Sequence, residues 1–247
     1  MGFSYRKDDD LAFLEDCTEA DIDQLAKFII YDSDGRERIT SKMKSSPEFK
    51  NLSGQPDQWR KSWKLVAGEL QHFGGDTLVN VIRRKGVVYH KILSDVCKKL
   101  GVKFDKRANS YDIESTLIES LVKSSWEKMS ESERHDALRT LDLPDLTSST
   151  LDSVLLLIRD KGHGAIAIAT LLAHSARLAF IPLTMKTMSA AGISIVARRG
   201  AASLANPLAA ILISIPMFTG TAYRVTIPAV IQIAYMRRKI ENEERFR

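Results

Sequence analysis

The sequence predicts an all-α protein, a helical bundle with an Ala/Gly-rich apolar C-terminal helical hairpin. Apolar residues recur three and four positions apart along most of the chain, and Ser, Thr, Asp, Gly or Pro stand where these patterns begin and end. No stretch alternates apolar and polar residues between hairpin turns, and no internal repeat is visible. Helices that bury such apolar faces against one another form bundles.

Residues 1–35 are expected to form a small N-terminal helical module. Thr18 and Asp21 resemble a capping box, which satisfies free amides at a helix start, so a helix should begin there. The inward face of this helix would consist of Ile22, Leu25, Ala26 and Ile29. The polar stretch 36–58 contains prolines and a glycine, which predicts a loop with short helical pieces.

Residues 36–150 are expected to form the bundle itself. An apolar stripe that includes Trp59 and Trp63 predicts a helix over 57–73, and Trp59 is expected to be partly exposed. Ser110 or Asp112 would cap a later helix. The further predicted helices cover 76–85, 87–100, about 110–129, 130–141 and, beyond a linker over 142–150, the range 151–160.

Charge is unevenly distributed along the chain. Residues 1–150 carry 24 Lys and Arg against 26 Asp and Glu, whereas residues 151–247 carry 12 against 5. No Asp or Glu occurs over residues 161–240, a stretch of 80 residues that holds nine Lys or Arg. Because a solvated surface usually mixes both signs of charge, we expect 151–247 to be an apolar, acid-poor helical region packed on the bundle. We call residues 161–240 the acid-free stretch.

Three physical explanations of the acid-free stretch stay open. Helices that are apolar on all sides can form the core of a soluble bundle. Helices rich in small residues also pack well in lipid, and the stretch can equally form an interface with a partner or a second copy. The run 200–223 alone reaches the roughly 20 residues that a spanning helix needs, and its Asn and two Pro residues weaken it. The sequence leaves open whether 162–236 inserts into a bilayer or forms a soluble core.

The membrane explanation gives a role to the cations beside the apolar runs. Cations near anionic headgroups bind favourably, at about 1 kcal/mol each, and the missing carboxylates are the groups that such a surface repels. The apolar segments 200–223 and 225–236 would dock beside these cations. The candidate lipid- or partner-binding residues are Arg198, Arg199, Arg224, Arg237, Arg238 and Lys239.

A second candidate site lies at the end of the helix predicted over 57–73. Glu69 and His72 have the Glu-x-x-His spacing of di-iron carboxylate sites. Such a site needs a second unit of this kind, which the chain lacks, so we interpret the stretch as a helix–turn–helix corner and a possible partner contact. Two glycines would provide a left-handed stop and an Asp would cap the next helix. The corner consists of Glu69, His72, Gly74, Gly75 and Asp76.

Motifs of the common enzyme classes are absent from the sequence. It has no phosphate loop, dinucleotide fingerprint, nucleophile elbow or zinc pattern, so we expect no catalytic residue, cofactor or metal. The basic clusters 81–85 and 197–199 lack interleaved aromatics, which argues against nucleic acid as a partner. Cys17 and Cys97 form no disulfide framework and no secretory signal is apparent, so a reducing, cytoplasmic location is expected.

Three stretches resemble a known family. Residues 65–77 (LVAGELQHFGGDT) and 222–238 (AYRVTIPAVIQIAYMRR) are similar to matching segments of the bacterial YaaW family, and residues 8–28 resemble the module that opens its members. The resemblance covers nearly the whole chain. The family is uncharacterised, and its central region is distantly similar to the ubiquinol–cytochrome c chaperone family, helical assembly factors that bind a membrane protein. The resemblance implies a chaperone-like binding role.

We therefore expect a non-enzymatic binding or assembly factor, chaperone-like, that acts at the cytoplasmic membrane face, peripheral to the inner membrane. Its partner would be a membrane surface or a membrane protein, and a homo-oligomer remains open. The alternative, from another class, is a pore-forming or membrane-damaging effector with a sheltered hydrophobic hairpin.

Overall fold

The computed structural model describes residues 5–31, 37–38, 43–74, 86–132, 134–135, 151–159 and 223–245. Within these ranges the chain is helical, and it contains no β-strand beyond an isolated bridge between Tyr31 and Glu37. The prediction of an all-α fold is therefore confirmed. The helix predicted over 76–85, the linker over 142–150 and the proposed hairpin within 162–222 lie outside the described residues.

The chain divides into two compact units. Unit 1 combines Met1–Thr116 with Thr219–Ile240, and unit 2 combines Leu117–Phe218 with Glu241–Arg247. The three ranges expected from the sequence, 1–35, 36–150 and 151–247, stay a prediction. Within unit 1, most of the last helix is grouped with the N-terminal half of the chain, through contacts described below.

The described helices of the two units are as follows, with η denoting a 3-10 helix. Unit 1 contains η1 (Asp9–Asp16), α1 (Glu19–Ile30), η2 (Met43–Ser45), α2 (Pro47–Leu52), α3 (Gln58–Lys61), α4 (Trp63–Phe73), α5 (Tyr89–Lys99), the start of α6 (Ser110–Lys128) and most of α12 (Tyr223–Arg245). Unit 2 contains the rest of α6 and α8 (Leu151–Arg159).

Helix α1 begins as the capping box predicts. The Thr18 hydroxyl oxygen accepts a hydrogen bond from the Asp21 amide at 3.3 Å. All four residues predicted for its inward face are fully buried, and α1 packs against α3 and α4. Glu19, in the first turn of α1, accepts hydrogen bonds from the Trp59 and Arg60 amides at 3.1 and 2.8 Å, so one helix caps the start of another.

The helix predicted over 57–73 is interrupted once. Ser62 separates α3 from α4 and leaves two helices along one apolar stripe. Trp63 is buried and Trp59 is half-buried, as expected for an apolar stripe in which Trp59 is partly exposed. The stripe therefore predicted the burial correctly, although it did not predict the break.

Gly74 ends α4 for a different reason from the predicted one. Its backbone is right-handed, with φ −65° and ψ −19°, so the prediction of a left-handed stop at this residue is wrong. A Cβ at this position would lie 2.5 Å from Cγ1 and 2.7 Å from Cδ1 of Ile92 on α5. Glycine is therefore needed so that the end of α4 can lie close to α5.

Helices α5 and α6 are capped by residues that their own sequence does not single out. The Tyr89 amide at the start of α5 donates to Oδ2 of Asp8 at 2.6 Å, across 81 positions of sequence. In α6 the side chain of Asn109 accepts from the Asp112 amide at 2.9 Å, so Asn109 takes the capping place predicted for Ser110 or Asp112. The end of α6 near Met129 agrees with the prediction.

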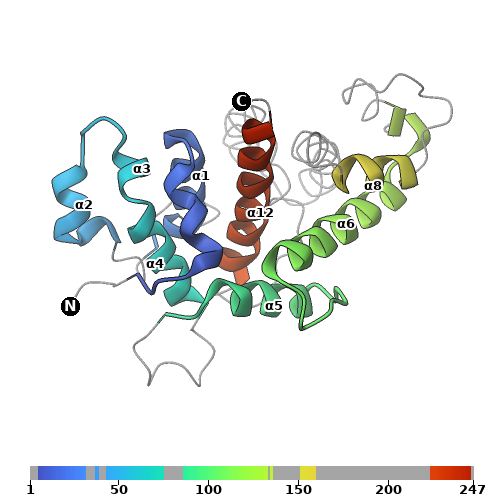
Figure 1. Ribbon diagram of the computed structural model, residues 1–247, viewed down its shortest axis with the longest axis horizontal. Helices are drawn as coiled ribbons and strands as arrows, with labels where there is room; N and C mark the ends of the chain where they lie inside the picture. Colours follow the sequence, from blue (N-terminus) through green and yellow to red (C-terminus); the bar gives the residue numbers. More distant parts are fainter. Residues whose placement is uncertain are drawn as a thin grey trace, which may run out of the picture. The chain divides into compact units, whose positions relative to one another are not determined.

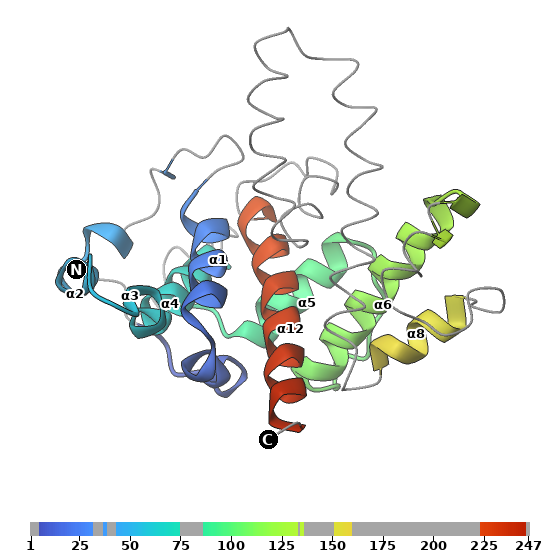
Figure 2. The same ribbon diagram turned by 90° about the horizontal axis from the view of Figure 1, so that it is seen from above.

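Helix α12 lies at the centre of unit 1. It runs beside α1 in both views, and its first residues lie next to α5 (Figures 1 and 2). At that end the Lys99 ammonium lies 5.2 Å from the ring centre of Tyr223. Its buried apolar residues point to more than one side, as expected for a core helix. They are Val225, Ile227, Ala229, Val230, Ile231, Ile233, Ala234 and Met236.

Candidate functional site

Three consecutive cations near the end of α12 make several polar contacts with other elements of unit 1. Successive residues on a helix point about 100° apart, so Arg237, Arg238 and Lys239 can reach different neighbours. They contact carboxylates or carbonyls contributed by η1, α1 and α6. We call these three cations together with Asp10, Asp21 and Glu114 the α12 anchor.

Glu114 is the central acceptor of the anchor. It lies in the first turns of α6 and is fully buried. Its Oε2 accepts from Nε of Arg237 at 3.1 Å and from Nη1 of Arg238 at 3.5 Å. Two guanidinium groups therefore share one carboxylate inside the unit, and their attraction is screened little by water.

Tyr89 provides a third contact to the same carboxylate. Its hydroxyl donates to Oε1 of Glu114 at 2.8 Å, and the whole side chain is buried. Burial raises the pKa of Tyr89 well above its usual value, the charge of Glu114 raises it further, and Arg237 opposes both. The hydroxyl therefore stays protonated and acts as a donor.

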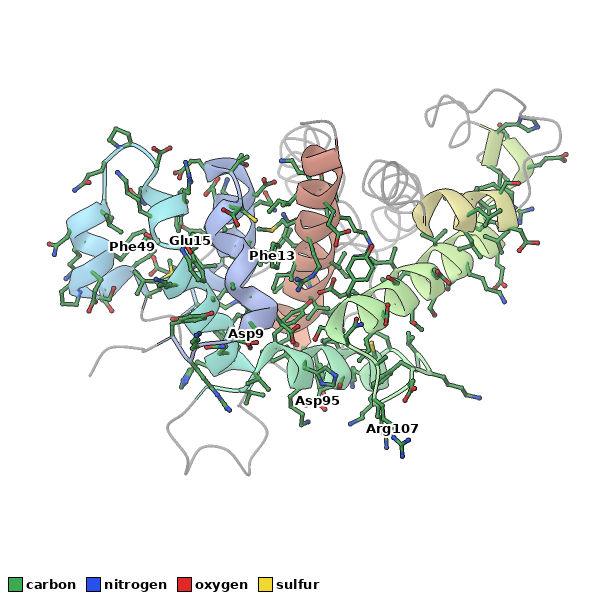
Figure 3. The ribbon with its side chains drawn as sticks, in the orientation of Figure 1. Asp9, Phe13, Glu15, Phe49, Asp95 and Arg107 are labelled. Atoms are coloured by element: carbon green, nitrogen blue, oxygen red, sulfur yellow. The ribbon has the colours of Figure 1, made fainter. Side chains whose placement is uncertain are left out.

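Arg237 ties α12 to η1 as well. Its Nη2 donates to the backbone oxygen of Asp10 at 2.7 Å, and its guanidinium lies 4.2 Å from the ring centre of Phe13. Figure 3 shows Phe13 beside α12. Burial alone would lower the pKa of Arg237, but Glu114, Tyr89 and Asp10 together outweigh it, so the pKa lies above its ordinary value. The side chain is a permanent cation.

Arg238 and Lys239 complete the anchor on two further elements. Arg238 is 3% exposed and donates to Oγ of Ser115 and to the carbonyl of Ala234, both at 2.8 Å. Lys239 contacts both carboxylate oxygens of Asp21 on α1, at 2.8 and 3.1 Å. Asp21 also accepts a hydrogen bond from the Thr18 hydroxyl, so the capping box of α1 is part of the anchor.

The anchor resembles a structural lock more closely than an acid–base site. Its three cations pair with the carboxylates of Glu114 and Asp21, and Arg237 also binds the backbone oxygen of Asp10. The Asp10 carboxylate accepts a hydrogen bond from the Ser110 hydroxyl at 2.6 Å. A buried carboxylate that binds two guanidiniums and a hydroxyl has its acceptor positions occupied. Removing one partner of such a cluster leaves an uncompensated buried charge, which costs several kcal/mol. The arrangement therefore fixes the position of α12 in unit 1.

The candidate lipid-binding cations are found in different settings. Arg237, Arg238 and Lys239 are engaged by carboxylates of the same chain, whereas Arg224 at the start of α12 is exposed. Arg198 and Arg199 lie outside the described residues. The hypothesis that these cations meet lipid or a partner stays a prediction, and Arg224 is the described cation whose exposure fits it best.

The corner at the end of α4 is held by groups that the sequence did not single out. Glu69 is fully buried while His72 is exposed, and Gly75 and Asp76 lie outside the described residues. In the described part of the chain, no group of three or more His, Cys, Asp or Glu side chains is arranged to hold a metal ion. The idea of a partner contact at this corner stays a prediction.

Gln71 supports the corner instead. Its side-chain amide pairs with the backbone of Arg6, accepting from the amide and donating to the carbonyl, both at 2.9 Å. The Val87 amide donates to the Gln71 carbonyl at 3.0 Å, and a Cβ on Gly86 would lie 2.7 Å from Cβ of Gln71. The N-terminal strap, residues 5–8, therefore joins the end of α4 to the start of α5.

Some of the residues missed by sequence reasoning left a signal. Glu114 occupies a position on the apolar stripe of α6, three and four residues before the buried Leu117 and Ile118. A Glu in such a place is buried, and buried carboxylates need cationic partners. The acid-free stretch contains cations with no local partner, so the two signals together could have suggested the pairing.

Among the helices that the structure describes, none is both long enough and apolar enough to cross a bilayer.

Comparison with known proteins gives a consistent set of relatives. Residues 5–39, which include Asp10 and Asp21 of the anchor, match the family described as "Domain of unknown function (DUF3944)". The chain is 37% identical over 243 residues to the UPF0174 protein YaaW of Escherichia coli strain K12, covering 97% of this chain and 98% of the relative. It is 29% identical over 255 residues to a UPF0174 protein of Helicobacter pylori strain J99, covering 98% and 96%.

No solved structure matches the chain. The names of these two relatives do not mention the ubiquinol–cytochrome c chaperone family, so the expected similarity to that family stays a prediction.

Proposed function

The chain belongs to the UPF0174 family, and on that premise we propose that it is a non-enzymatic, chaperone-like binding or assembly factor that acts at the cytoplasmic membrane face. The observation that carries the proposal is the attachment of the acid-free stretch to a folded unit. Helix α12 contains the end of that stretch, and the anchor fixes it in unit 1. The C-terminal end of the stretch is therefore held in unit 1.

The charge distribution supports contact with an anionic surface. Of the nine cations in the acid-free stretch, three are paired within the anchor with acids from outside the stretch. Arg224 is described and exposed, and the other five lie outside the described residues. Anionic headgroups attract such cations, and apolar side chains add to the binding. We propose that the segment 200–223 and the adjoining Arg198, Arg199 and Arg224 meet the membrane or a membrane protein.

Flotation with vesicles tests this proposal. The full chain should float with vesicles that contain phosphatidylserine at low salt, and high salt should weaken binding because exposed charges are screened. Replacing Arg198→Gln and Arg199→Gln should weaken binding by about 30-fold, since each cation contributes about 1 kcal/mol near an anionic surface.

The matched control removes two exposed cations elsewhere. Lys50→Gln with Arg60→Gln changes the net charge equally on α2 and α3, where both side chains are exposed, and binding should persist. A full chain that never floats at low salt contradicts the proposal. Release of a trapped dye from the same vesicles would instead favour the membrane-damaging effector over the assembly factor.

A further inference from the structure

An exposed basic surface covers the outer side of α5 and the loop that follows it. Residues 91–107 contain six Lys or Arg and two Asp. Five of the six cations are exposed, and we call these five the α5 basic patch. They are Lys91, Lys98, Lys103, Lys106 and Arg107.

The helical part of the patch faces one side. Lys91, Asp95 and Lys98 are spaced four and three residues apart, so they share one face of α5. Lys91 and Lys98 both pair with Asp95, and their side chains are 53% and 56% exposed. Figure 3 shows Asp95 and Arg107 on the same lower side of unit 1. The loop therefore extends the basic surface of the helix.

The loop is held at both ends. Gly101, at φ +72°, ends α5, and the Val102 amide donates to the carbonyl of Cys97 at 2.9 Å. At the other end a ring nitrogen of His90 lies 3.2 Å from the carbonyl of Ala108, directly before the Asn109 cap of α6. The cations of the loop therefore project from a segment whose two ends are held by these contacts.

The patch keeps a net positive charge after its internal pairs are counted. Asp95 is shared by two lysines, and Asp105 accepts a hydrogen bond from the backbone amide of Arg107. No ion pair engages Lys103, Lys106 or the Arg107 side chain within the described residues. Five cations against two carboxylates leave a charge of +3 on an exposed surface.

We propose that the α5 basic patch is the surface through which unit 1 meets an anionic lipid bilayer, an inference that rests on the proposed function. Four of the five cations are lysines, which act as point charges and need no fixed geometry. Attraction to anionic headgroups likewise depends on charge rather than on a fixed geometry. Single-stranded nucleic acid would call for aromatic platforms. The one aromatic residue of 91–107, Phe104, is half-buried. Lipid is therefore the anionic partner that the patch fits best.

Vesicle partition of a triple variant tests the inference. Lys103→Gln, Lys106→Gln and Arg107→Gln remove the three unpaired cations from exposed positions of the full chain. Partition onto phosphatidylserine vesicles at low salt should fall about fivefold per charge, and on the order of 100-fold in all. The matched control is Lys50→Gln, Arg60→Gln and Lys61→Gln, which removes the same charge from α2 and α3 and should bind as the unchanged protein does.

The outcomes separate this inference from the proposed function. Loss of partition in the patch variant alone supports the inference. Equal loss in both triple variants overturns it, because net charge alone then explains binding. If both triple variants still partition onto vesicles, the α5 basic patch is not the contact surface and the inference is overturned. The acid-free stretch then remains the proposed membrane contact. Failure of the unchanged protein to bind vesicles overturns both proposals, and so does binding to an oligonucleotide in place of vesicles. Circular dichroism and thermal melting confirm that each variant is folded.

Discussion

Glu114 is the residue on which the position of α12 depends most strongly. It is fully buried and contacts Arg237, Arg238 and the Tyr89 hydroxyl. A buried ion pair need not make a protein more stable than an apolar replacement would, but breaking it leaves a charge without compensation. Glu114 is therefore better understood as a residue that specifies where α12 sits than as a large net source of stability.

Replacing Glu114→Gln should lower the free energy of unfolding by roughly 3–5 kcal/mol, because both guanidiniums would face a neutral amide in a buried site. Urea denaturation followed by circular dichroism measures the change. The matched control is Glu48→Gln on α2, an exposed residue whose loss should cost less than about 1 kcal/mol. Equal midpoints for the two variants would show that the anchor does not hold α12.

The two buried thiols predict how stability depends on pH. Burial, with a smaller contribution from Asp21, raises the pKa of Cys17 from 9.0 to about 12, although Lys239 opposes it. Burial raises the pKa of Cys97 from 9.0 to about 11. Because the folded pKa is the higher one, this stabilisation is fully present below about pH 9 and is lost as the pH rises toward the folded values.

Stability should therefore fall by roughly 2 kcal/mol per thiol between about pH 8 and pH 10.5. Urea midpoints at the two pH values measure the fall in the unchanged protein and in the double variant Cys17→Ala, Cys97→Ala. The variant should lose less stability over this interval. If both proteins lose the same amount, the thiols are not responsible for the alkaline loss.

At the level of single residues, sequence reasoning identified the cations of α12 but not their partners. Arg237 and Glu114 are 123 positions apart, and Lys239 and Asp21 are 218 apart. Local patterns carry no information about which carboxylate a distant cation meets. The partners become visible only when the fold brings η1, α1 and α6 around the same helix.

The join between α4 and α5 is the clearest case at the level of elements. Gly74 is right-handed and lies where a Cβ would collide with the Ile92 side chain. The sequence correctly predicted that the helix ends at Phe73. It accounted for Gly74 by a left-handed backbone conformation, whereas the structure accounts for it by the lack of a side chain. Close approach of two helices depends on the partner helix, which a single-sequence pattern does not reveal.

Gly74→Ala should destabilise the protein by about 1–3 kcal/mol through overpacking against Ile92. In an Ile92→Ala background the colliding atoms are absent, so adding Gly74→Ala should cost nothing or recover some stability. A double-mutant cycle from urea denaturation gives this coupling. Additive effects of the two substitutions would mean that the two positions do not touch as described.

Capping divides the elements into those that sequence could and could not predict. Thr18 with Asp21 opens α1 as predicted, because the cap and the helix are neighbours in the chain. The caps of α3 and α5 come from Glu19 and Asp8, at distances of 40 and 81 positions. Caps supplied by another element satisfy the same free amides, but they produce no sequence pattern beside the helix that they cap.

For the whole molecule, the uneven charge of the chain has a structural counterpart. The N-terminal 150 residues carry a small excess of acids and the remainder a marked excess of cations. Part of this excess is used inside unit 1, where α12 meets Asp10, Asp21 and Glu114. The sequence predicted the imbalance, but it assigned these cations to an external surface because it could not show which of them find partners within the chain.

The central claim is that α12 stays fixed in unit 1 while the acid-free stretch before it binds an anionic membrane. Hydrogen exchange of the full chain, with and without phosphatidylserine vesicles at low salt, tests it most directly. The account predicts new protection within residues 161–222 on vesicles, together with unchanged slow exchange in α12. Identical exchange of 161–222 in both conditions, or loss of protection in α12 on vesicles, would contradict it.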